Sequence, residues 1–283
     1  MTELPLPLLI AVAPTGAHKS KADHEALPME PREIAVTAAR CRLAGAGLLH
    51  LHVRDERGEH SLSPARYREA LQAVRTVAGR ELLVQISTEA CGRYSLDQQM
   101  ATVRNLKVDA ASYALREFFA GEVVDPRVVE FFAWVTGLGV GGQFTLYTPA
   151  EQARLQGLVA RRVLPVSRPH ALFVLPRHGA SQQSDPGELH AFLQGWPTDW
   201  PWSVCADGPS ELAVADLAIR LGGHVRVGFE HNLYEVDGSL LDNNETRVRQ
   251  VAELAARAGR PLATPSQVQA LFAAPDAATP HGQ

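Results

Sequence analysis

The segment Leu49-His50-Leu51-His52-Val53-Arg54 alternates apolar side chains with two imidazoles and a guanidinium. Alternate side chains of an extended strand point to the same face, so His50, His52 and Arg54 share one face. Two imidazoles in this arrangement converge on one point. One carboxylate from elsewhere would complete a metal site with three protein ligands and an open position for substrate. The candidate carboxylate is Glu230, and the pattern therefore predicts a strand that binds a metal.

Short apolar runs alternate with longer helical patterns along the chain, and this alternation predicts the fold. A proline marks the start of several of the intervening helices, as Pro31, Pro64, Pro126 and Pro209 do. Eight strand-then-helix units in 283 residues predict an α/β protein with a (β/α)₈ TIM barrel. A doubly wound open sheet uses the same alternation and is the alternative. The expected strands are residues 8–13, 48–54, 82–87, 110–114, 143–146, 170–175, 202–206 and 224–227.

One catalytic domain over residues 1–272 is the simplest division of the chain. Residues 273–283 are rich in alanine, proline and glycine without periodicity, so we expect a disordered C-terminal tail.

A barrel fold tests the metal hypothesis, because barrel enzymes place their chemistry at the carboxyl ends of the strands. A His-x-His pair in an arbitrary strand is more often packed or solvated than bound to metal. An arginine such as Arg226 inside a closed barrel requires an anion or a carboxylate beside it. The polar residues that fall at the expected catalytic rim are His50, His52, Arg54, Ser87, Thr88, Arg226 and Glu230.

Composition narrows the class of partner. A net charge of −4 with scattered arginines gives no broad basic field for nucleic acid or an anionic membrane, so a small-molecule substrate is favoured. Cys41, Cys91 and Cys205 have neither disulfide nor zinc-motif spacing. No apolar run approaches the roughly 18 residues of a membrane span, and the first residues lack a basic signal region. We therefore expect a cytoplasmic protein without a membrane segment.

Several motifs occur in an order that carries a family resemblance over most of the chain, from Leu8 to Leu271. They are Thr15-Gly16-Ala17, residues 28–33, His50-Leu51-His52-Val53-Arg54-Asp55, Gln85-Ile86-Ser87-Thr88, residues 223–230 and the closing stretch 259–265. With these motifs the chain resembles the β-keto acid cleavage enzymes, which include the 3-keto-5-aminohexanoate cleavage enzyme.

The resemblance implies a tetrameric (β/α)₈ barrel that binds one divalent metal, usually zinc, through His50, His52 and Glu230. The implied reaction converts a β-keto acid and acetyl-CoA into acetoacetate and a new acyl-CoA. Chelation of the keto acid would acidify the methylene between its two carbonyl groups and permit attack on the thioester. Ser87 is implied to contact the substrate carboxylate, and Arg226 to act beside the base and steady the enolate or oxyanion.

Three positions depart from the best-known family member, which has carboxylates there. His18 replaces a glutamate that contacts the substrate amine, His231 replaces an aspartate paired with the arginine, and Thr145 occupies a further glutamate position. A cationic substrate would lose its counter-charges, so we expect a neutral or anionic keto acid. His231 could serve as the base, since an imidazole titrates near neutrality.

Other residues are candidate substrate contacts, and other functions stay open. The additional candidates are Arg54, Thr88, Ser112 and Arg116, of which Arg116 could meet an acidic tail. The alternatives are a metal-dependent aldolase or hydrolase that does not use acetyl-CoA, and a metal-binding barrel that has lost activity. Acyl-CoA formed together with acetoacetate separates the exchange reaction from both.

Overall fold

A computed structural model describes residues 6–176 and 184–273 of the chain. Eight parallel strands close into a barrel in the order β1-β10-β9-β8-β7-β6-β5-β2, which confirms the TIM barrel and excludes the open sheet. Residues 274–283 of the expected tail lie outside the described residues. The barrel strands are β1 (Ile10–Val12), β2 (Leu48–Leu51), β5 (Leu83–Ser87), β6 (Ala110–Ala114), β7 (Gly141–Leu146), β8 (His170–Val174), β9 (Trp202–Cys205) and β10 (His224–Val227).

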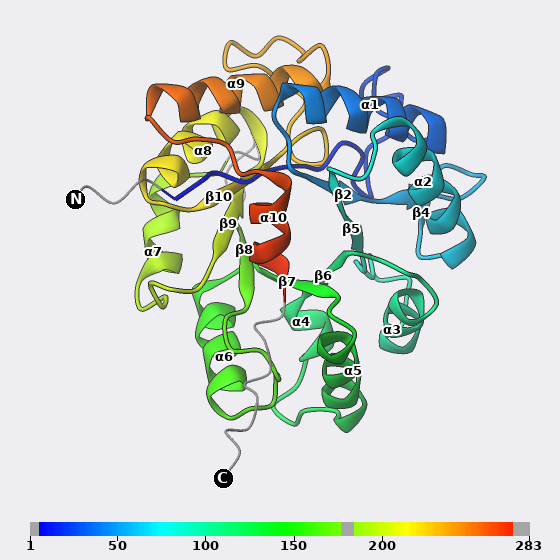
Figure 1. The fold of residues 1–283 in the computed structure, drawn as a ribbon, viewed down its shortest axis with the longest axis vertical. Helices are drawn as coiled ribbons and strands as arrows, with labels where there is room; N and C mark the ends of the chain where they lie inside the picture. Colours follow the sequence, from blue (N-terminus) through cyan, green and yellow to red (C-terminus); the bar gives the residue numbers. More distant parts are fainter. Residues whose placement is uncertain (1–5, 177–183, 274–283) are drawn as a thin grey trace.

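Helices surround the barrel, and Figure 1 shows most of them arranged around a central α10. The helices are α1 (Pro31–Ala44), α2 (Pro64–Val77), α3 (Leu96–Arg104), α4 (Leu115–Phe118), α5 (Pro126–Gly137), α6 (Pro149–Ala160), α7 (Leu189–Leu193), α8 (Glu211–Arg220), α9 (Asn244–Arg257) and α10 (Pro265–Phe272), with short 3₁₀ turns η1 (Pro186–Glu188) and η2 (Gly208–Ser210).

Proline at the first turn starts several of these helices, as predicted. Pro31, Pro64 and Pro126 are the first residues of α1, α2 and α5, and Pro209 lies in the 3₁₀ turn that leads into α8. The missing proline N–H is one that a helix start leaves unpaired in any case, and the fixed φ suits the first turn. These signals therefore located the helices that follow the strands.

Helix α10 closes the amino-terminal end of the barrel. Its Val268 and Phe272 pack in a separate apolar cluster with Leu48 and Leu83, the first residues of β2 and β5, and with Leu9, which precedes β1. A side chain at Gly141, the first residue of β7, would contact Phe272 Cβ at 2.6 Å, so glycine permits this close packing. The apolar plug leaves the carboxyl ends of the strands as the end of the barrel that can carry chemistry.

The expected strand over residues 48–54 is interrupted, which corrects the sequence prediction. Barrel strand β2 ends at Leu51, and β3 (Val53–Arg54) pairs antiparallel with β4 (His60–Ser61) in a separate hairpin. The alternation continues through both strands, so the sequence does not reveal the change of partner. The hairpin carries Arg54 out of the barrel wall and toward the loop that follows β1.

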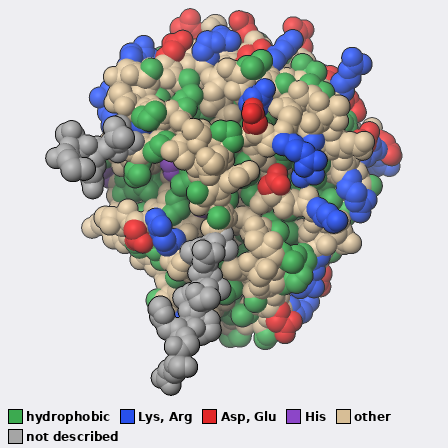
Figure 2. Space-filling model, viewed as in Figure 1, with side chains coloured by type: hydrophobic (Ala, Val, Ile, Leu, Met, Phe, Trp, Pro, Cys, Tyr) green, Lys and Arg blue, Asp and Glu red, His purple; other side chains and the backbone are tan. Residues whose placement is uncertain are grey.

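The surface carries both acidic and basic side chains (Figure 2). Acidic and basic side chains are interspersed on the face drawn in Figure 2. Within the described residues, no helix combines the length and the apolar character needed to cross a membrane.

Candidate active site

A cavity of about 330 Å³ lies at the carboxyl ends of the barrel strands. Its walls come from loops that follow β1, β5 and β10 and from the ends of several strands, which is where barrel enzymes build their sites. The structure thus brings together residues that are far apart in the sequence. The predicted residues that line it are His18, His50, Ser87, Ser112, Arg116, Thr145, Arg226, Glu230 and His231.

Three donor atoms converge at the base of this cavity. His50 Nε2 lies 3.1 Å from His52 Nε2, and Glu230 Oε2 lies 3.7 Å and 3.6 Å from these two nitrogens. Glu230 Oε2 is buried and has no hydrogen-bond partner among the described residues. A buried carboxylate oxygen without a partner is costly unless a cation or a donor fills the position that it faces. The group therefore fits a divalent metal with two imidazoles and one carboxylate.

The outer nitrogens of the two imidazoles have partners of their own. His50 Nδ1 lies 2.8 Å from Gln85 Oε1, and His52 Nδ1 lies 3.4 Å from His60 Nδ1. Gln85 in turn donates to Gln143 at 3.2 Å, within the barrel. Such partners fix the ring orientation and leave each Nε2 directed at the metal position.

The protonation states also suit metal binding. Burial lowers the pKa of both His50 and His52 well below the usual range, so both imidazoles are neutral. Burial raises the pKa of Glu230, but the Arg226 charge and His50 outweigh it, and the net pKa lies below the usual value. Neutral imidazoles and an ionised carboxylate are the forms that bind a cation.

Arg226 and His231 form a buried polar group beside the metal position. Arg226 Nη2 lies 3.4 Å from Glu230 Oε1, and Arg226 Nε donates to His231 Nε2 at 3.1 Å. The opposite nitrogen, His231 Nδ1, lies 3.7 Å from Asp207 Oδ1. A carboxylate facing one imidazole nitrogen supports positive charge that develops when the other nitrogen takes a proton. Burial lowers the pKa of His231, but Cys205 and Asp207 outweigh it and raise the pKa to about 10, which corrects the expectation of titration near neutrality. The arrangement can therefore hold an oxyanion near neutrality, and His231 can take a proton once alkaline pH has made it neutral.

Glu89 places a further carboxylate in the cavity. Its Oε1 lies 3.8 Å from His18 Nε2, and its Oε2 lies 4.0 Å from His52 Nε2. Burial alone would raise the pKa of Glu89, but the effects of His18 and His52 are larger and lower it. The net pKa lies below the usual value, so the carboxylate is ionised. The cavity wall next to the metal position is thus negatively charged.

Three other predicted residues lie away from the cavity lining. His52 is absent from the cavity lining, and its Nε2 lies 3.1 Å from His50 Nε2 and 3.6 Å from Glu230 Oε2. Arg54 Nη2 donates to the backbone carbonyls of Gly16 and Lys19, both at 2.8 Å, and so braces the loop after β1. Thr88 donates to the Ser112 carbonyl at 2.7 Å. The contacts of Arg54 and Thr88 in this structure are therefore to the protein backbone.

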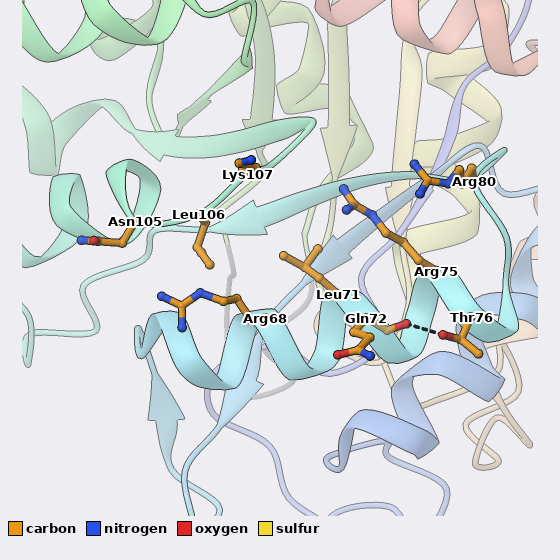
Figure 3. A pocket seen from close by; sticks show the side chains of 9 residues that line it. All are labelled: Arg68, Leu71, Gln72, Arg75, Thr76, Arg80, Asn105, Leu106 and Lys107. Atoms are coloured by element: carbon orange, nitrogen blue, oxygen red, sulfur yellow. Dashed lines mark hydrogen bonds between the residues drawn. The ribbon is translucent and has the colours of Figure 1, made fainter.

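A larger pocket of about 610 Å³ lies against the outer face of α2. Figure 3 shows its lining, which includes Arg68, Arg75, Arg80 and Lys107 around Leu71 and Leu106. No histidine, cysteine or carboxylate lines it, so it offers no metal ligand or base. The smaller cavity at the strand ends is therefore the candidate active site.

A family model described as beta-keto acid cleavage enzyme matches residues 7–273. The chain belongs to the β-keto acid cleavage enzyme family. This confirms the resemblance that the motifs carry, and the match extends over nearly the whole barrel.

Two curated proteins and one solved structure are similar to this chain over most of its length. It is 28% identical over 274 residues to the 3-keto-5-aminohexanoate cleavage enzyme of Fusobacterium nucleatum, with 94% of this chain and 97% of that protein covered. It is 28% identical over 286 residues to the 3-oxoadipate:acetyl-CoA acetyltransferase of Cupriavidus necator, with 95% of each chain covered. The structure titled "Ternary complex of ObcA with C4-CoA adduct and oxalate" superposes with a TM-score of 0.67 at 18% identity, covering 87% of this chain and 67% of that one. This likeness shows a shared fold.

Two acidic side chains in the cavity of this β-keto acid cleavage enzyme were not predicted from the sequence, namely Glu89 and Asp207. The departures at His18, His231 and Thr145 suggested a cavity without these carboxylates, but Glu89 and Asp207 also line it. Each of the two faces an imidazole. Both follow directly after a barrel strand, β5 and β9, and that position is a signal that could have identified them. Lys19 and Tyr147 also line the cavity and were not predicted.

The backbone that carries Glu230 is held by buried contacts. Gly228 adopts a φ of 130°, and its N–H donates to Glu211 Oε1 at 3.0 Å. The Phe229 N–H donates to Asn244 Oδ1 at 2.9 Å, and the Glu230 N–H donates to the Ala13 carbonyl at 3.0 Å. Residues of α8 and α9, together with Ala13 directly after β1, therefore fix the turn that directs Glu230 toward the histidines.

Replacing Gly228 by alanine is expected to destabilise the protein and to weaken metal binding. The added Cβ would lie 2.6 Å from the Ala13 carbonyl oxygen and 2.8 Å from Asn244 Oδ1, at a φ that side chains rarely adopt. We expect a loss of about 2–4 kcal/mol in the free energy of unfolding, measured by urea denaturation.

Gly238→Ala is the matched control, because Gly238 also has a positive φ of 86° but no neighbouring heavy atom within 4 Å of the added Cβ. It isolates the backbone strain, which we expect to cost about 1 kcal/mol. Equal losses in the two variants would contradict the importance of the close contacts at Gly228.

Proposed function

We propose that this protein is an acyltransferase that converts a β-keto acid and acetyl-CoA into acetoacetate and a new acyl-CoA. The observation that carries the proposal is the convergence of His50, His52 and Glu230 beside Arg226 in a member of the β-keto acid cleavage enzyme family. A divalent metal bound by the three ligands would polarise the keto and carboxylate oxygens of the substrate and acidify the methylene group between them.

His231 is our candidate for the group that takes the methylene proton. Its Nε2 accepts a hydrogen bond from Arg226 Nε at 3.1 Å, so this bond must open before Nε2 takes the proton, and the raised pKa of His231 favours the neutral, basic form at alkaline pH. Asp207 faces Nδ1 and supports the charge that the imidazole gains. The resulting carbanion attacks the acetyl thioester, and the CoA thiolate then attacks the other ketone carbonyl. Cleavage of the carbon–carbon bond releases acetoacetate, whose methylene recovers the proton from His231.

Arg226 and Ser87 are proposed to bind the oxygen atoms of the substrate. Arg226 uses Nε and Nη2 for contacts within the protein, whereas Nη1 has no acceptor among the described residues. A guanidinium held in this way can donate to a developing oxyanion without reorganising. Ser87 also lines the cavity, and its position at the end of β5 suits a contact with the substrate carboxylate.

The position of Arg116 indicates that the substrate carries an acidic tail. It follows β6 at the cavity, its guanidinium lies 3.6 Å from the centroid of the Tyr147 ring, and no carboxylate of the described residues pairs with it. Glu89 and Asp207 already face imidazoles, so they leave the charge of Arg116 available. We therefore propose an anionic β-keto acid, and the relative from Cupriavidus necator, named for 3-oxoadipate, supports this substrate class.

Arg116→Gln is expected to lower kcat/KM for a β-keto acid with an acidic tail by roughly 10- to 100-fold, because a charge-assisted hydrogen bond is lost. The value for a neutral β-keto acid should change little. Steady-state kinetics with 3-oxoadipate and with a neutral keto acid of similar length measure the difference.

Arg104→Gln is the control for that change, since Arg104 also lies over aromatic rings, those of Phe131 and Trp134, but outside the cavity. An equal loss on both substrates in Arg116→Gln would contradict a specific role in binding the tail.

Omission of acetyl-CoA tests the reaction type. An exchange enzyme consumes the keto acid only when the thioester is present and forms acetoacetate and acyl-CoA in equal amounts. A hydrolase or aldolase consumes the keto acid without the thioester. Zinc as the native ion, a homotetrameric assembly and a cytoplasmic location stay predictions from the sequence.

A further inference from the structure

A second group of potential metal ligands lies next to the proposed metal position. His18 comes from the loop after β1, whereas Glu89 and Cys91 come from the loop after β5. One ligand atom from each of the three residues lies within 4.8 Å of the other two. None of the three belongs to the group formed by His50, His52 and Glu230, so the cluster is unexplained by the proposed function.

The loop that carries Glu89 and Cys91 is held in an unusual conformation. Cys91 has a φ of 50°, in the left-handed region that residues other than glycine seldom adopt. The Ala90 N–H donates to the Glu117 carboxylate at 3.2 Å, and Gln99 donates to the Thr88 carbonyl at 2.7 Å. Neighbouring contacts therefore hold a strained cysteine beside Glu89, and strain of this kind concentrates at functional sites.

The donor types indicate which cation would bind. An imidazole nitrogen, a carboxylate oxygen and a thiolate sulfur are the three ligand types of protein zinc sites, and three protein ligands leave one position open. Burial and Glu89 raise the pKa of the Cys91 thiol, so it becomes a thiolate only when a metal displaces its proton. A sulfur ligand disfavours magnesium and calcium, which prefer oxygen ligands. The His18 side chain is 74% exposed, so it has room for the movement of about 1 Å that would bring the ligands to zinc-bond distances.

Glu89 connects this cluster to the first metal position. Its Oε1 faces His18 Nε2 at 3.8 Å, whereas its Oε2 faces His52 Nε2 at 4.0 Å. The two oxygens of one carboxylate thus point toward two separate donor groups. Paired metal ions in enzymes lie about 3.5–4 Å apart, a separation that one carboxylate can span.

We propose that His18, Glu89 and Cys91 bind a second divalent cation of the zinc class, with Glu89 between the two metal positions. Because His18 and Glu89 line the same cavity, the open position of this cation is available to an oxygen atom of an anionic substrate. The proposal goes beyond the acyl-exchange function and does not depend on it.

Cobalt substitution tests the second site directly. The protein is stripped with a chelator and titrated with Co²⁺ alone, bound cobalt is counted by elemental analysis, and the near-ultraviolet absorption is recorded. We expect about two cobalt ions per chain and a thiolate-to-cobalt charge-transfer band. In Cys91→Ser the band should disappear and about one ion should remain, held by the untouched His50, His52 and Glu230.

Two further variants complete the test. Glu89→Gln should also reduce the count to about one ion, and it serves in place of Cys91→Ser if the serine variant fails to fold. Cys41→Ala removes a thiol that is buried away from the cluster, so it should leave both the count and the band unchanged. A single cobalt ion in the unmodified protein, or a charge-transfer band that survives Cys91→Ser, would overturn the proposal. Neither outcome bears on the exchange reaction, which is measured separately.

Discussion

Replacing His50 by alanine is expected to remove metal from the first site and to abolish acyl exchange in the same variant. The substitution deletes one of two facing nitrogens and leaves Glu230 Oε2 opposite a single imidazole. We expect turnover to fall by at least about 10³-fold, because a bound metal supplies several kcal/mol of transition-state stabilisation. Elemental analysis and an acyl-CoA assay on the same preparation measure both losses.

One further substitution serves as a control for this effect, and another tests the partner of His50. His170→Gln changes another buried barrel histidine, which lies 2.8 Å from Ser203 Oγ and takes no part in the cavity, so metal content should be unchanged. Gln85→Ala removes the partner of His50 Nδ1 and should weaken metal affinity by about 10- to 100-fold. Full metal content at the first site in His50→Ala would show that the ligand set is wrong.

Arg226→Lys is expected to reduce kcat by roughly 10²- to 10³-fold while the metal stays bound. Lysine keeps the positive charge near Glu230 but loses the planar fork that contacts Glu230 and His231 together. The variant thus separates the geometry of the donors from the net charge. Steady-state kinetics give kcat, and elemental analysis of the same sample gives the metal content.

Arg220→Lys is the matched control for this change, because Arg220 forms an exposed pair with Asp216 on α8 and should leave kcat unaltered. If Arg226→Lys lost its metal together with its activity, Arg226 would be needed for the ligand set instead of for the chemistry. A kcat within a factor of two of the original would contradict any direct role.

The sequence could indicate that His50, His52 and Glu230 lie together, because part of the spacing rule is local. His50 and His52 alternate along one short segment, and Glu230 follows a strand that closes the barrel beside β1, so barrel closure brings the three together. The strands and the proline-marked helices were predicted for a similar reason, since each depends on a short window of sequence.

The residues that sequence reasoning missed depend on contacts between distant segments. Asp207 meets His231 because β9 and β10 are neighbours, and no local pattern in either loop shows this. Arg54 was predicted as a substrate contact because it keeps the alternation of a strand, but its backbone joins a hairpin and its guanidinium bonds to the loop after β1. Loop directions and side-chain partners of this kind are set by the closed barrel and not by periodicity.

Transfer of an isotopic label tests the central claim most directly. The metal-loaded protein is incubated with 3-oxoadipate and acetyl-CoA labelled in the acetyl group, and the products are identified by mass spectrometry. Our account predicts that the label enters acetoacetate and that the new acyl-CoA contains the unlabelled acyl group of the keto acid. Loss of the keto acid without a new acyl-CoA, or release of the label as acetate, would contradict acyl exchange.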